Sequence, residues 1–337
     1  MRAINLLVCA ALLLTVLLGC GSGNQMGSFP QPPVPVAGKI FVANGSSNTI
    51  LRFGMGDNGN VNPGARITST ALHAPIALLS DTANDRLYVF SLADADILVF
   101  NNVSTRNGST VPDRLIAGAA TTLPLLTGSI SVALDNSRDL LYVTSTNILV
   151  FAPASSVTGN VPPLRVISTA FTPRAIALDP ANDRMFVTDP VNNAIAIFDH
   201  ASALNGAVVP DRVISGTSTQ LASPGVLALD NSGRLIVCGT FGQRNLLVFP
   251  NAAIANGNIG PAASALLPSS AFQTAISPTG ELYVADGNPS VSVYSNIATA
   301  SGLLTPVRTI VGPNTGLDPF TLAIPPFVFG IAIDPTR

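Results

Sequence analysis

Residues 175–214 read AIALDPANDRMFVTDPVNNAIAIFDHASALNGAVVPDRVI. Four runs of five or six residues within this stretch, 175–179, 184–189, 194–198 and 210–214, are rich in aliphatic, β-branched and aromatic residues, and Asp, Asn, Gly and Pro separate them. Runs of this length and composition predict β-strands joined by turns. The stretch therefore predicts one small sheet of four strands.

The same pattern occurs six times along the chain. Its clearest marker is the aromatic residue that ends the third run, which recurs every 45 to 51 residues at Phe53, Phe100, Phe151, Phe198, Phe249 and Tyr294. A long period built from short strands is typical of a radial array in which each repeat forms one sheet. The sequence therefore predicts an all-β fold, a six-bladed β-propeller with four antiparallel strands in each blade.

The two ends of the repeat region complement each other. Residues 330–335 have the sequence of a first strand with no second strand after it, whereas residues 39–44 have the sequence of a second strand with no first strand before it. Pairing of these two segments would complete one blade and leave no open edge in the ring. We therefore expect residues 39–337 to form one propeller domain, closed by its N- and C-terminal strands.

Three further positions recur within the repeat. An acidic residue ends the first strand at Asp81, Asp135, Asp179, Asp230 and Asp334, and it is predicted to brace a tight turn. A Gly between the third and fourth strands predicts a turn of positive φ. Pro and Arg then begin the outermost strand, with Arg at 66, 114, 165, 212 and 308. The Pro predicts that the outer edge of this strand is unpaired, and the Arg side chains are predicted to be solvated charges on that edge.

The N-terminus has the layout of an export signal. Arg2 is followed by an apolar run from Leu6 to Leu18 that is short for a membrane-spanning helix, and then by Gly19 and Cys20. The Leu-Leu-Gly-Cys box resembles that of a bacterial lipoprotein, which implies a signal peptide over 1–19 and a lipid on Cys20. Residues 20–38, rich in Gly, Ser, Asn, Gln and Pro, are predicted to be a flexible tether.

The resemblance also implies a location. It places the mature chain in the bacterial cell envelope, anchored to the membrane through its lipid. Gly21 rather than Asp follows the Cys, which in a Gram-negative host resembles the outer-membrane default. Once Cys9 leaves with the signal and Cys20 carries lipid, Cys238 has no disulfide partner, and its apolar neighbours predict a buried core residue.

Charge and aromatic content argue against nucleic acid as a partner. Sixteen Lys and Arg residues against eighteen Asp and Glu give a net charge of −2, and the chain has no Trp. Such a chain has neither the positive field that captures phosphate backbones nor the row of rings on which bases stack.

The repeats resemble those of NHL-type and related six-bladed bacterial propellers over residues 39–337. The segments Leu282-Tyr283-Val284-Ala285-Asp286 and Ser290-Val291-Ser292-Val293-Tyr294 carry this resemblance best. It implies the fold but not one activity, because the same ring serves lactonases, lyases and interaction modules.

One face of the ring is predicted to bind the partner. The crossover loops that join one blade to the next vary from 11 to 24 residues between equivalent positions, and this variation is typical of an elaborated face. The partner on this face is predicted to be a protein or a small molecule. The apolar residues of the two longest loops would suit a protein or lipid partner, or would plug the central channel; they include Leu125, Leu126, Phe320, Phe327 and Phe329.

A metal-dependent enzyme is the alternative. Asn44, Asp189 and Asp286 end second strands. This arrangement resembles that of lactonase propellers, which place acidic and amide ligands for Ca²⁺ at the channel mouth. His73 is predicted to lie in a loop on the same face. The Glu ligand of those enzymes has no clear counterpart, and the Asp residues also fit ordinary turns. The sequence thus favours an envelope-anchored binding or scaffold module, with a lactonase-like hydrolase or lyase as the alternative.

Overall fold

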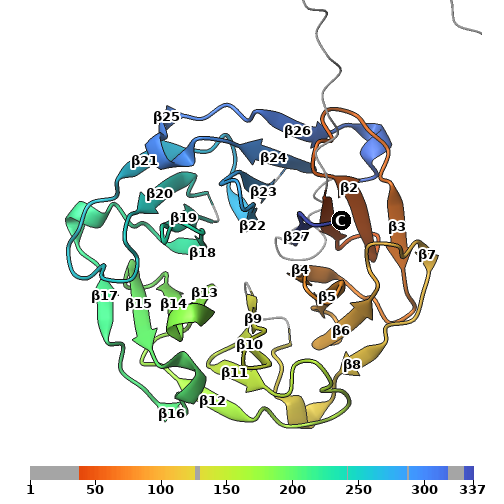
Figure 1. Ribbon diagram of the computed structural model, residues 1–337, viewed down its shortest axis with the longest axis horizontal. Helices are drawn as coiled ribbons and strands as arrows, with labels where there is room; N and C mark the ends of the chain where they lie inside the picture. Colours follow the sequence, from red (N-terminus) through yellow and green to blue (C-terminus); the bar gives the residue numbers. More distant parts are fainter. Residues whose placement is uncertain (1–37, 126–129, 241, 287, 318–329) are drawn as a thin grey trace, which may run out of the picture. The chain divides into compact units, whose positions relative to one another are not determined.

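The chain folds into six small sheets arranged around a central axis (Figure 1). The computed structural model describes residues 38–125, 130–240, 242–286, 288–317 and 330–337. This arrangement is the predicted six-bladed β-propeller. Six short 3₁₀ helices accompany the strands in these residues, η1 (Ala119–Thr121), η2 (Pro180–Asn182), η3 (Ala201–Ala203), η4 (Thr217–Thr219), η5 (Ile297–Thr299) and η6 (Pro313–Thr315).

Each blade has four antiparallel strands, and we number the blades in chain order. From axis to rim, the strands are β27 (Ile331–Asp334), β1 (Lys39–Asn44), β2 (Thr49–Gly54) and β3 (Ala65–Thr68) in blade 1; β4 (Pro75–Asp81), β5 (Arg86–Ser91), β6 (Asp96–Asn101) and β8 (Arg114–Ile116) in blade 2; and β9 (Val132–Asp135), β10 (Leu140–Thr144), β11 (Ile148–Phe151) and β12 (Arg165–Ser168) in blade 3. Blades 4 to 6 consist of β13 (Ile176–Asp179), β14 (Arg184–Asp189), β15 (Ala194–Asp199) and β17 (Arg212–Ile214); β18 (Pro224–Leu229), β19 (Leu235–Gly239), β20 (Asn245–Phe249) and β21 (Ala263–Leu266); and β22 (Ala271–Ile276), β23 (Leu282–Asp286), β24 (Ser290–Tyr294) and β26 (Arg308–Val311).

Blade 1 joins the two ends of the repeat region, as the sequence predicts. β27 pairs antiparallel with β1, with Val42 opposite Ile331 and Lys39 opposite Asp334. Ala43 N also donates to Gly330 O at 2.8 Å, which extends the pairing beyond the strand. The innermost strand of this blade is therefore supplied by the last residues of the chain.

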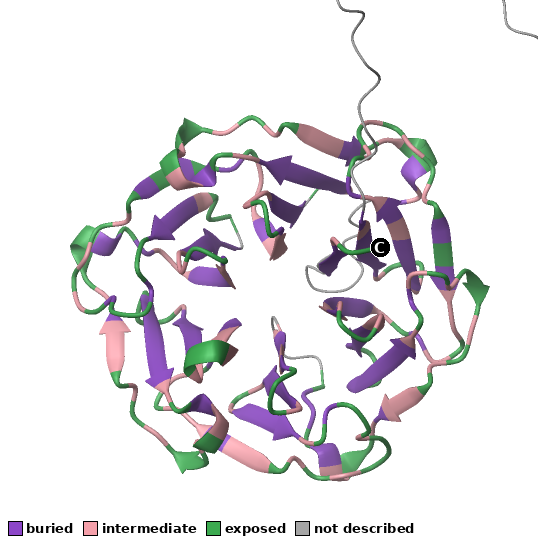
Figure 2. Ribbon diagram, viewed as in Figure 1, coloured by how far each residue is buried: buried purple, intermediate pink, exposed green. Residues whose placement is uncertain are grey.

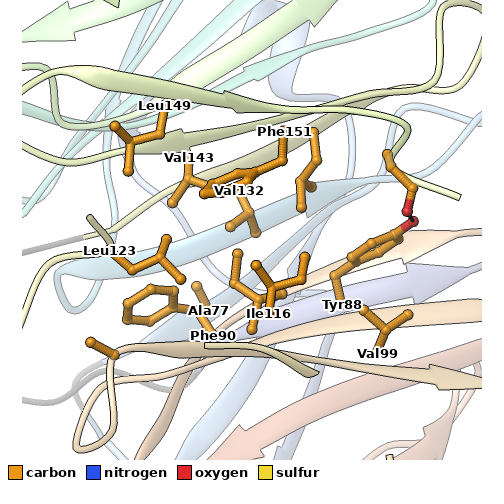
Figure 3. Close-up of a cluster of buried hydrophobic side chains, with 14 of the residues drawn as sticks. Ala77, Tyr88, Phe90, Val99, Ile116, Leu123, Val132, Val143, Leu149 and Phe151 are labelled. Carbon is orange, nitrogen blue, oxygen red and sulfur yellow. Dashed lines mark hydrogen bonds between the residues drawn. The ribbon is translucent and has the colours of Figure 1, made fainter. Parts of the chain in front are cut away.

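The core lies between neighbouring blades. Six clusters of buried hydrophobic side chains fill the spaces from one sheet to the next. Figure 3 shows one of them, in which Phe90 of β5 and Ile116 of β8 pack against Val143 and Phe151 of blade 3. Burial of a Phe or Ile side chain stabilises the fold by roughly 1.5–3 kcal/mol. Figure 2 shows the resulting pattern, with buried residues along the strands and exposed residues in the loops.

The acidic residues after the first strands brace turns, as predicted. Asp135 accepts from Ser137 N at 3.0 Å, and Asp230 accepts from Ser232 N at 2.9 Å. Asp81, Asp179 and Asp334 accept from backbone N–H groups in the same way. These carboxylates lie at the face where the innermost strands end, which we call the turn face.

The outer rim differs from the prediction of an unpaired edge. The Gly between the third and fourth strands of each blade has positive φ as expected, but it pairs in parallel with the outermost strand of the preceding blade. Three of these contacts are long enough to form a fifth strand, β7 (Gly108–Ser109), β16 (Gly206–Ala207) and β25 (Ser301–Leu303). The prediction was wrong because the Asn-Gly loops reach beyond their own sheet.

The rim arginines are likewise not simple solvated charges. Arg114 donates to Ala154 O at 2.8 Å and Val157 O at 3.0 Å in the next blade, and its guanidinium lies 5.7 Å from the centre of the Tyr88 ring. Arg308 pairs with Glu281 at 3.0 Å. Since carbonyl oxygens of a neighbouring blade are good acceptors for a guanidinium, arginine at this position can hold two blades together.

Candidate functional site

A cavity of ≈ 230 Å³ lies on the axis of the ring. Every blade contributes lining residues, from 78–80, 130–132, 174–176, 225–227, 272–275 and 331–333. These residues belong to the innermost strands or directly precede them, and Figure 1 shows those strands around the centre. Concave sites that several structural units build together are the usual places for small ligands.

The cavity lies toward the face where the innermost strands begin and the second strands end, which we call the crossover face. The strand register defines this face, since Ile176 near the start of β13 lies opposite Val187 near the end of β14. The same register brings Pro75 opposite Ser91 and Ala271 opposite Asp286. The cavity therefore lies at the end of the channel nearer to the crossover loops.

A second cavity of ≈ 260 Å³ continues along the axis toward the turn face. It shares Leu79, Val132, Ile176, Leu227, Thr274 and Ala275 with the first. Its other lining residues are all apolar, among them Leu134, Leu178 and Leu229. Polar side chains therefore gather near the crossover face, while backbone groups of the innermost strands also supply polar surface toward the turn face.

Arg174 is the one charged side chain among the described residues that line the cavity of the crossover face. It directly precedes β13, and its backbone is fixed because Arg174 N donates to Thr188 O at 3.2 Å and Thr144 Oγ1 donates to Arg174 O at 3.2 Å. Burial lowers the pKa of the guanidinium to about 10, so that the group remains protonated at neutral pH. The channel thus carries a positive charge in a protein of net charge −2.

Four uncharged polar side chains accompany Arg174 in the lining of this cavity, Ser80, Ser131, Gln273 and Thr274. Ser131 Oγ accepts from Ile176 N at 3.2 Å, which leaves its O–H able to donate. The Gln273 amide bonds to the backbone of other innermost strands, with Nε2 donating to Leu78 O at 2.8 Å. This end of the channel therefore presents one charged side chain, three hydroxyl-bearing side chains and a fixed amide.

The predicted metal ligands are engaged in their own turns. Asn44 is buried at the end of β1, and its Nδ2 donates to Ser47 Oγ at 2.7 Å and to Gly316 O at 2.9 Å. Asp189 accepts from Asn192 N at 3.1 Å and from Asn192 Nδ2 at 2.6 Å. Neither residue is among those that line the channel.

The carboxylate of Asp286 is also hydrogen-bonded to residues that follow it closely in the chain. Its carboxylate accepts from Ser290 Oγ at 2.7 Å, Ser292 Oγ at 3.0 Å and Asn288 N at 3.1 Å. Burial raises the pKa of Asp286, and these hydrogen bonds lower it in part. The residue also lies outside the channel lining, and no group of three His, Cys, Asp or Glu residues in the described segments could hold a metal ion.

His73 lies beside two carboxylates. Its Nδ1 is 2.5 Å from Asp94 Oδ2, and both side chains are 46% exposed. Asp96, at the start of β6, is only 4% exposed, and its Oδ1 has no hydrogen-bond partner in the described structure. Burial and the nearby Asp94 raise the pKa of Asp96 to about 7, whereas His73 lowers it in part.

Asp96 was not among the predicted site residues, although the sequence carries a signal for it. The residue four positions before the repeated aromatic is neutral in the other copies, where it is Thr49, Asn147, Ala194, Asn245 and Ser290. A carboxylate at the same position of blade 2 is therefore exceptional within the repeat. Arg174 gave no such signal because it lies in a crossover loop, where the copies differ in length.

Some of the remaining predicted residues lie in the described segments and others lie outside them. Leu125 is 62% exposed before β9, whereas Cys20, Leu126, Phe320, Phe327 and Phe329 lie outside the described residues. Cys238 is buried as predicted, and burial raises the pKa of its thiol to about 12. In the segments that the structure describes, no helix has the length and apolar character needed to cross a bilayer.

Comparisons with known proteins support the fold. No protein-family model matches the chain, and no curated protein sequence matches it significantly. A chain in the crystal structure of a nidogen/laminin complex has 16% identity and a TM-score of 0.56, over 88% of this chain and 98% of that one. A chain in the crystal structure of a mitotic checkpoint complex has 13% identity and a TM-score of 0.50, over 90% and 91%. At these identities the similarity establishes a shared fold.

Proposed function

We propose that this chain is a binding module whose ligand occupies the crossover-face end of the central channel. The observation that carries the proposal is the axial cavity of ≈ 230 Å³, to which all six blades contribute. A site of this volume suits a small molecule, because a water molecule occupies about 30 Å³ of liquid. Rigid strands form its walls, so that little ordering would be needed on binding.

Binding is a better account of this site than hydrolysis. A Ca²⁺ ion needs several oxygen ligands that can turn toward it. The side chains of Asp189 and Asp286 accept hydrogen bonds from their own turns, and Asn44 Nδ2 donates to Ser47 and Gly316. Moving these groups onto a metal would break bonds that hold the second-strand ends in place.

Ligand-detected NMR with a mixed set of small anionic, neutral and cationic molecules tests the proposal. We expect some members to bind the full chain, and we expect Thr274→Leu to weaken all of them by about tenfold or more, because Thr274 lines both cavities. Val209→Leu, on the 86% exposed rim, is the matched control. Binding that survives Thr274→Leu unchanged would place the ligand elsewhere.

A protein partner on the same face is a second candidate. The exposure of Leu125 favours it, since an exposed large aliphatic side chain in the crossover loop before β9 can anchor a partner. Capture of an envelope protein by the wild-type chain but not by Leu125→Asp would support this candidate. Equal capture by both chains would count against it.

We further propose that the chain acts at the bacterial cell envelope, held there by lipid on Cys20. The support is the sequence of the first twenty residues, with an apolar run that ends in Leu-Leu-Gly-Cys. Two or three acyl chains would hold the protein on a bilayer, since each buried methylene adds roughly 0.8 kcal/mol. The propeller would then project from the membrane on the tether of residues 20–38.

A further inference from the structure

We propose that the outer rim of blades 5 and 6 rests on the lipid bilayer, with Leu266 and Leu303 in contact with the outer ends of the acyl chains. This inference rests on the lipid anchor on Cys20 proposed above, and it adds the surface through which the propeller meets the membrane. It follows from the exposed side chains of this rim and from the short segment that joins Cys20 to blade 1.

Two exposed leucines lie side by side on the rim. Leu266 ends β21 and is 45% exposed, and Leu303 ends β25 and is 66% exposed. The two strands are parallel neighbours, and Leu266 is the partner of Leu303 in their register. Side chains at paired positions of neighbouring strands project from the same face of a sheet. The rim of blade 5 therefore presents an aliphatic pair to solvent.

The equivalent pairs elsewhere on the rim consist of small residues. Among the described strands, this parallel contact occurs three times, between β3 and β7, β12 and β16, and β21 and β25. The partners at the matching position are Thr68 and Ser109 in the first contact and Ser168 and Ala207 in the second. Since the same contact forms with small residues, the fold does not require two leucines in the third.

This side of the ring also carries little charge. Between Arg244 and Arg308 the sequence has only two charged residues, Glu281 and Asp286. Asp286 is buried, and Glu281 pairs with Arg308 at 3.0 Å. Contact with lipid would therefore remove few charged groups from water, and transfer of charged groups is the most costly part of burying a protein surface in an apolar medium.

Blade 6 also lacks a rim carboxylate that blades 2 and 4 have. The residue before the rim arginine is Asp113 in blade 2 and Asp211 in blade 4, but in blade 6 it is Val307, which is 50% exposed. Val311, at the end of β26, is 43% exposed. Figure 1 shows β25 and β26 in succession along the rim. Exposed aliphatic side chains thus continue from β25 to the outermost strand of blade 6.

The anchored segment makes a bilayer the fitting partner for this rim. Residues 21–38 separate Cys20 from Lys39, where β1 begins. A flexible chain of this length spans about 20–25 Å on average. Blade 1 is the neighbour of blade 6 in the ring, because Phe53 and Ile310 pack in one buried cluster. A lipid on Cys20 would therefore hold the rim of blade 6 close to a bilayer.

The tether allows a weak contact to be sufficient. A few partly exposed aliphatic side chains would not hold a free protein on a membrane, but a short tether raises the effective concentration of the rim at the bilayer to the millimolar range. The sequence has no Lys or Arg from 245 to 307. Anionic lipids would therefore add little attraction, and the contact should be insensitive to salt.

Tryptophan fluorescence tests the contact directly, because the chain has no Trp of its own. Leu303→Trp places a reporter on the proposed surface, and Ala207→Trp places one at the matching position of β16. Both chains are lipidated and reconstituted in phosphatidylcholine vesicles with or without bromine on the acyl chains. We expect bromine to reduce the emission of Leu303→Trp about twofold or more and to leave that of Ala207→Trp unchanged. Equal quenching of the two reporters, or quenching of neither, would overturn the inference.

A charge beside the reporter checks that lipid causes the quenching. Leu266→Asp combined with Leu303→Trp should lose most of the quenching, because transfer of a carboxylate from water to an apolar medium is costly. Ser168→Asp combined with Leu303→Trp puts the same charge at the equivalent position of blade 3 and should keep the quenching of the single variant. Circular dichroism checks that each chain remains folded. Full quenching in a folded chain with Leu266→Asp contradicts lipid contact.

The anchor and the rim contact fail in different ways. If the wild-type chain does not float with vesicles, the anchor fails and the inference fails with it. If the chain floats but Leu303→Trp is not quenched, the anchor stands and the rim does not touch lipid. If the emission of Leu303→Trp shifts to shorter wavelength only in native envelope membranes, a protein partner covers the rim and the lipid contact is rejected.

Discussion

The side-chain amide of Gln273 pairs with both backbone groups of Leu78. Gln273 Nε2 donates to Leu78 O at 2.8 Å, and Leu78 N donates to Gln273 Oε1 at 3.2 Å. The same Oε1 accepts from Ile331 N at 2.9 Å. Since Gln273, Leu78 and Ile331 belong to β22, β4 and β27, one side chain connects the innermost strands of blades 6, 2 and 1. This contact lies where the ring closes.

Loss of this amide should destabilise the ring. We expect Gln273→Ala to lower the free energy of unfolding by about 2–4 kcal/mol, because buried backbone groups of Leu78 and Ile331 would lose their partners. Urea unfolding followed by circular dichroism measures the change. Gln243→Ala, at an exposed position, is the control and should lie within about 0.5 kcal/mol of wild type. Equal stabilities of the two variants would show that the Gln273 contacts contribute nothing.

Removal of the last eight residues should prevent stable ring closure. Deletion of 330–337 leaves β1 without its partner β27 and exposes a strand edge beside the channel. We expect the truncated chain to lose cooperative unfolding and to be cleaved rapidly by protease. Deletion of Arg337 alone keeps β27 and is the control. A truncated chain that still unfolds cooperatively near the wild-type midpoint would contradict this account of closure.

The ring and its closure could be predicted because they depend on local patterns. The repeated aromatic and the short alternating strands determine each sheet, and the unmatched segments 39–44 and 330–335 leave one consistent pairing. In the structure Val42 lies opposite Ile331, so the predicted segments do meet. These predictions need only the spacing of the repeats and the number of strands in each repeat, and both can be read from the sequence.

Contacts between blades could not be predicted in the same way. Asn160 Oδ1 accepts from Ala120 N at 2.8 Å, and Asn258 Oδ1 accepts from Ser218 N at 2.7 Å, each across about forty residues. A loop with Asn and Gly predicts a turn, but its sequence does not say that the turn reaches the preceding sheet. The position of Arg174 at the channel likewise depends on the path of a crossover loop, which has no repeated pattern.

Calcium should have little effect on this protein. Asp189 and Asp286 already accept hydrogen bonds within their turns, so we expect the thermal midpoint to be the same in Ca²⁺ and in chelator. Differential scanning calorimetry, with metal analysis of the purified chain, measures this. A stoichiometric ion that raises the midpoint by several degrees would instead favour the hydrolase or lyase. In that case Asp286→Asn should remove the increase.

Lipid on Cys20 is the basis of the predicted location. Cells grown with labelled palmitate should incorporate label into the wild-type chain and not into Cys20→Ser, which should also be recovered in the aqueous phase after detergent extraction. Cys238→Ser is the matched control and should remain labelled, because Cys238 is buried in the propeller. Label on Cys20→Ser would contradict the lipoprotein resemblance.

Asp96 should make stability depend on pH. Its pKa is raised from 3.8 to about 7, so between about pH 4 and pH 7 the native state holds a proton that the unfolded state has released. The unfolded state therefore binds fewer protons in this window, and stability falls as pH rises through it. We expect Asp96→Asn, which stays neutral, to match wild type near pH 4 and to be more stable at pH 8. The gain is on the order of 1–3 kcal/mol. Urea unfolding at both pH values measures it, with Asp113→Asn on the rim as a control that should keep the wild-type decline. An Asp96→Asn chain that declines as steeply as wild type would assign the pH dependence to other groups.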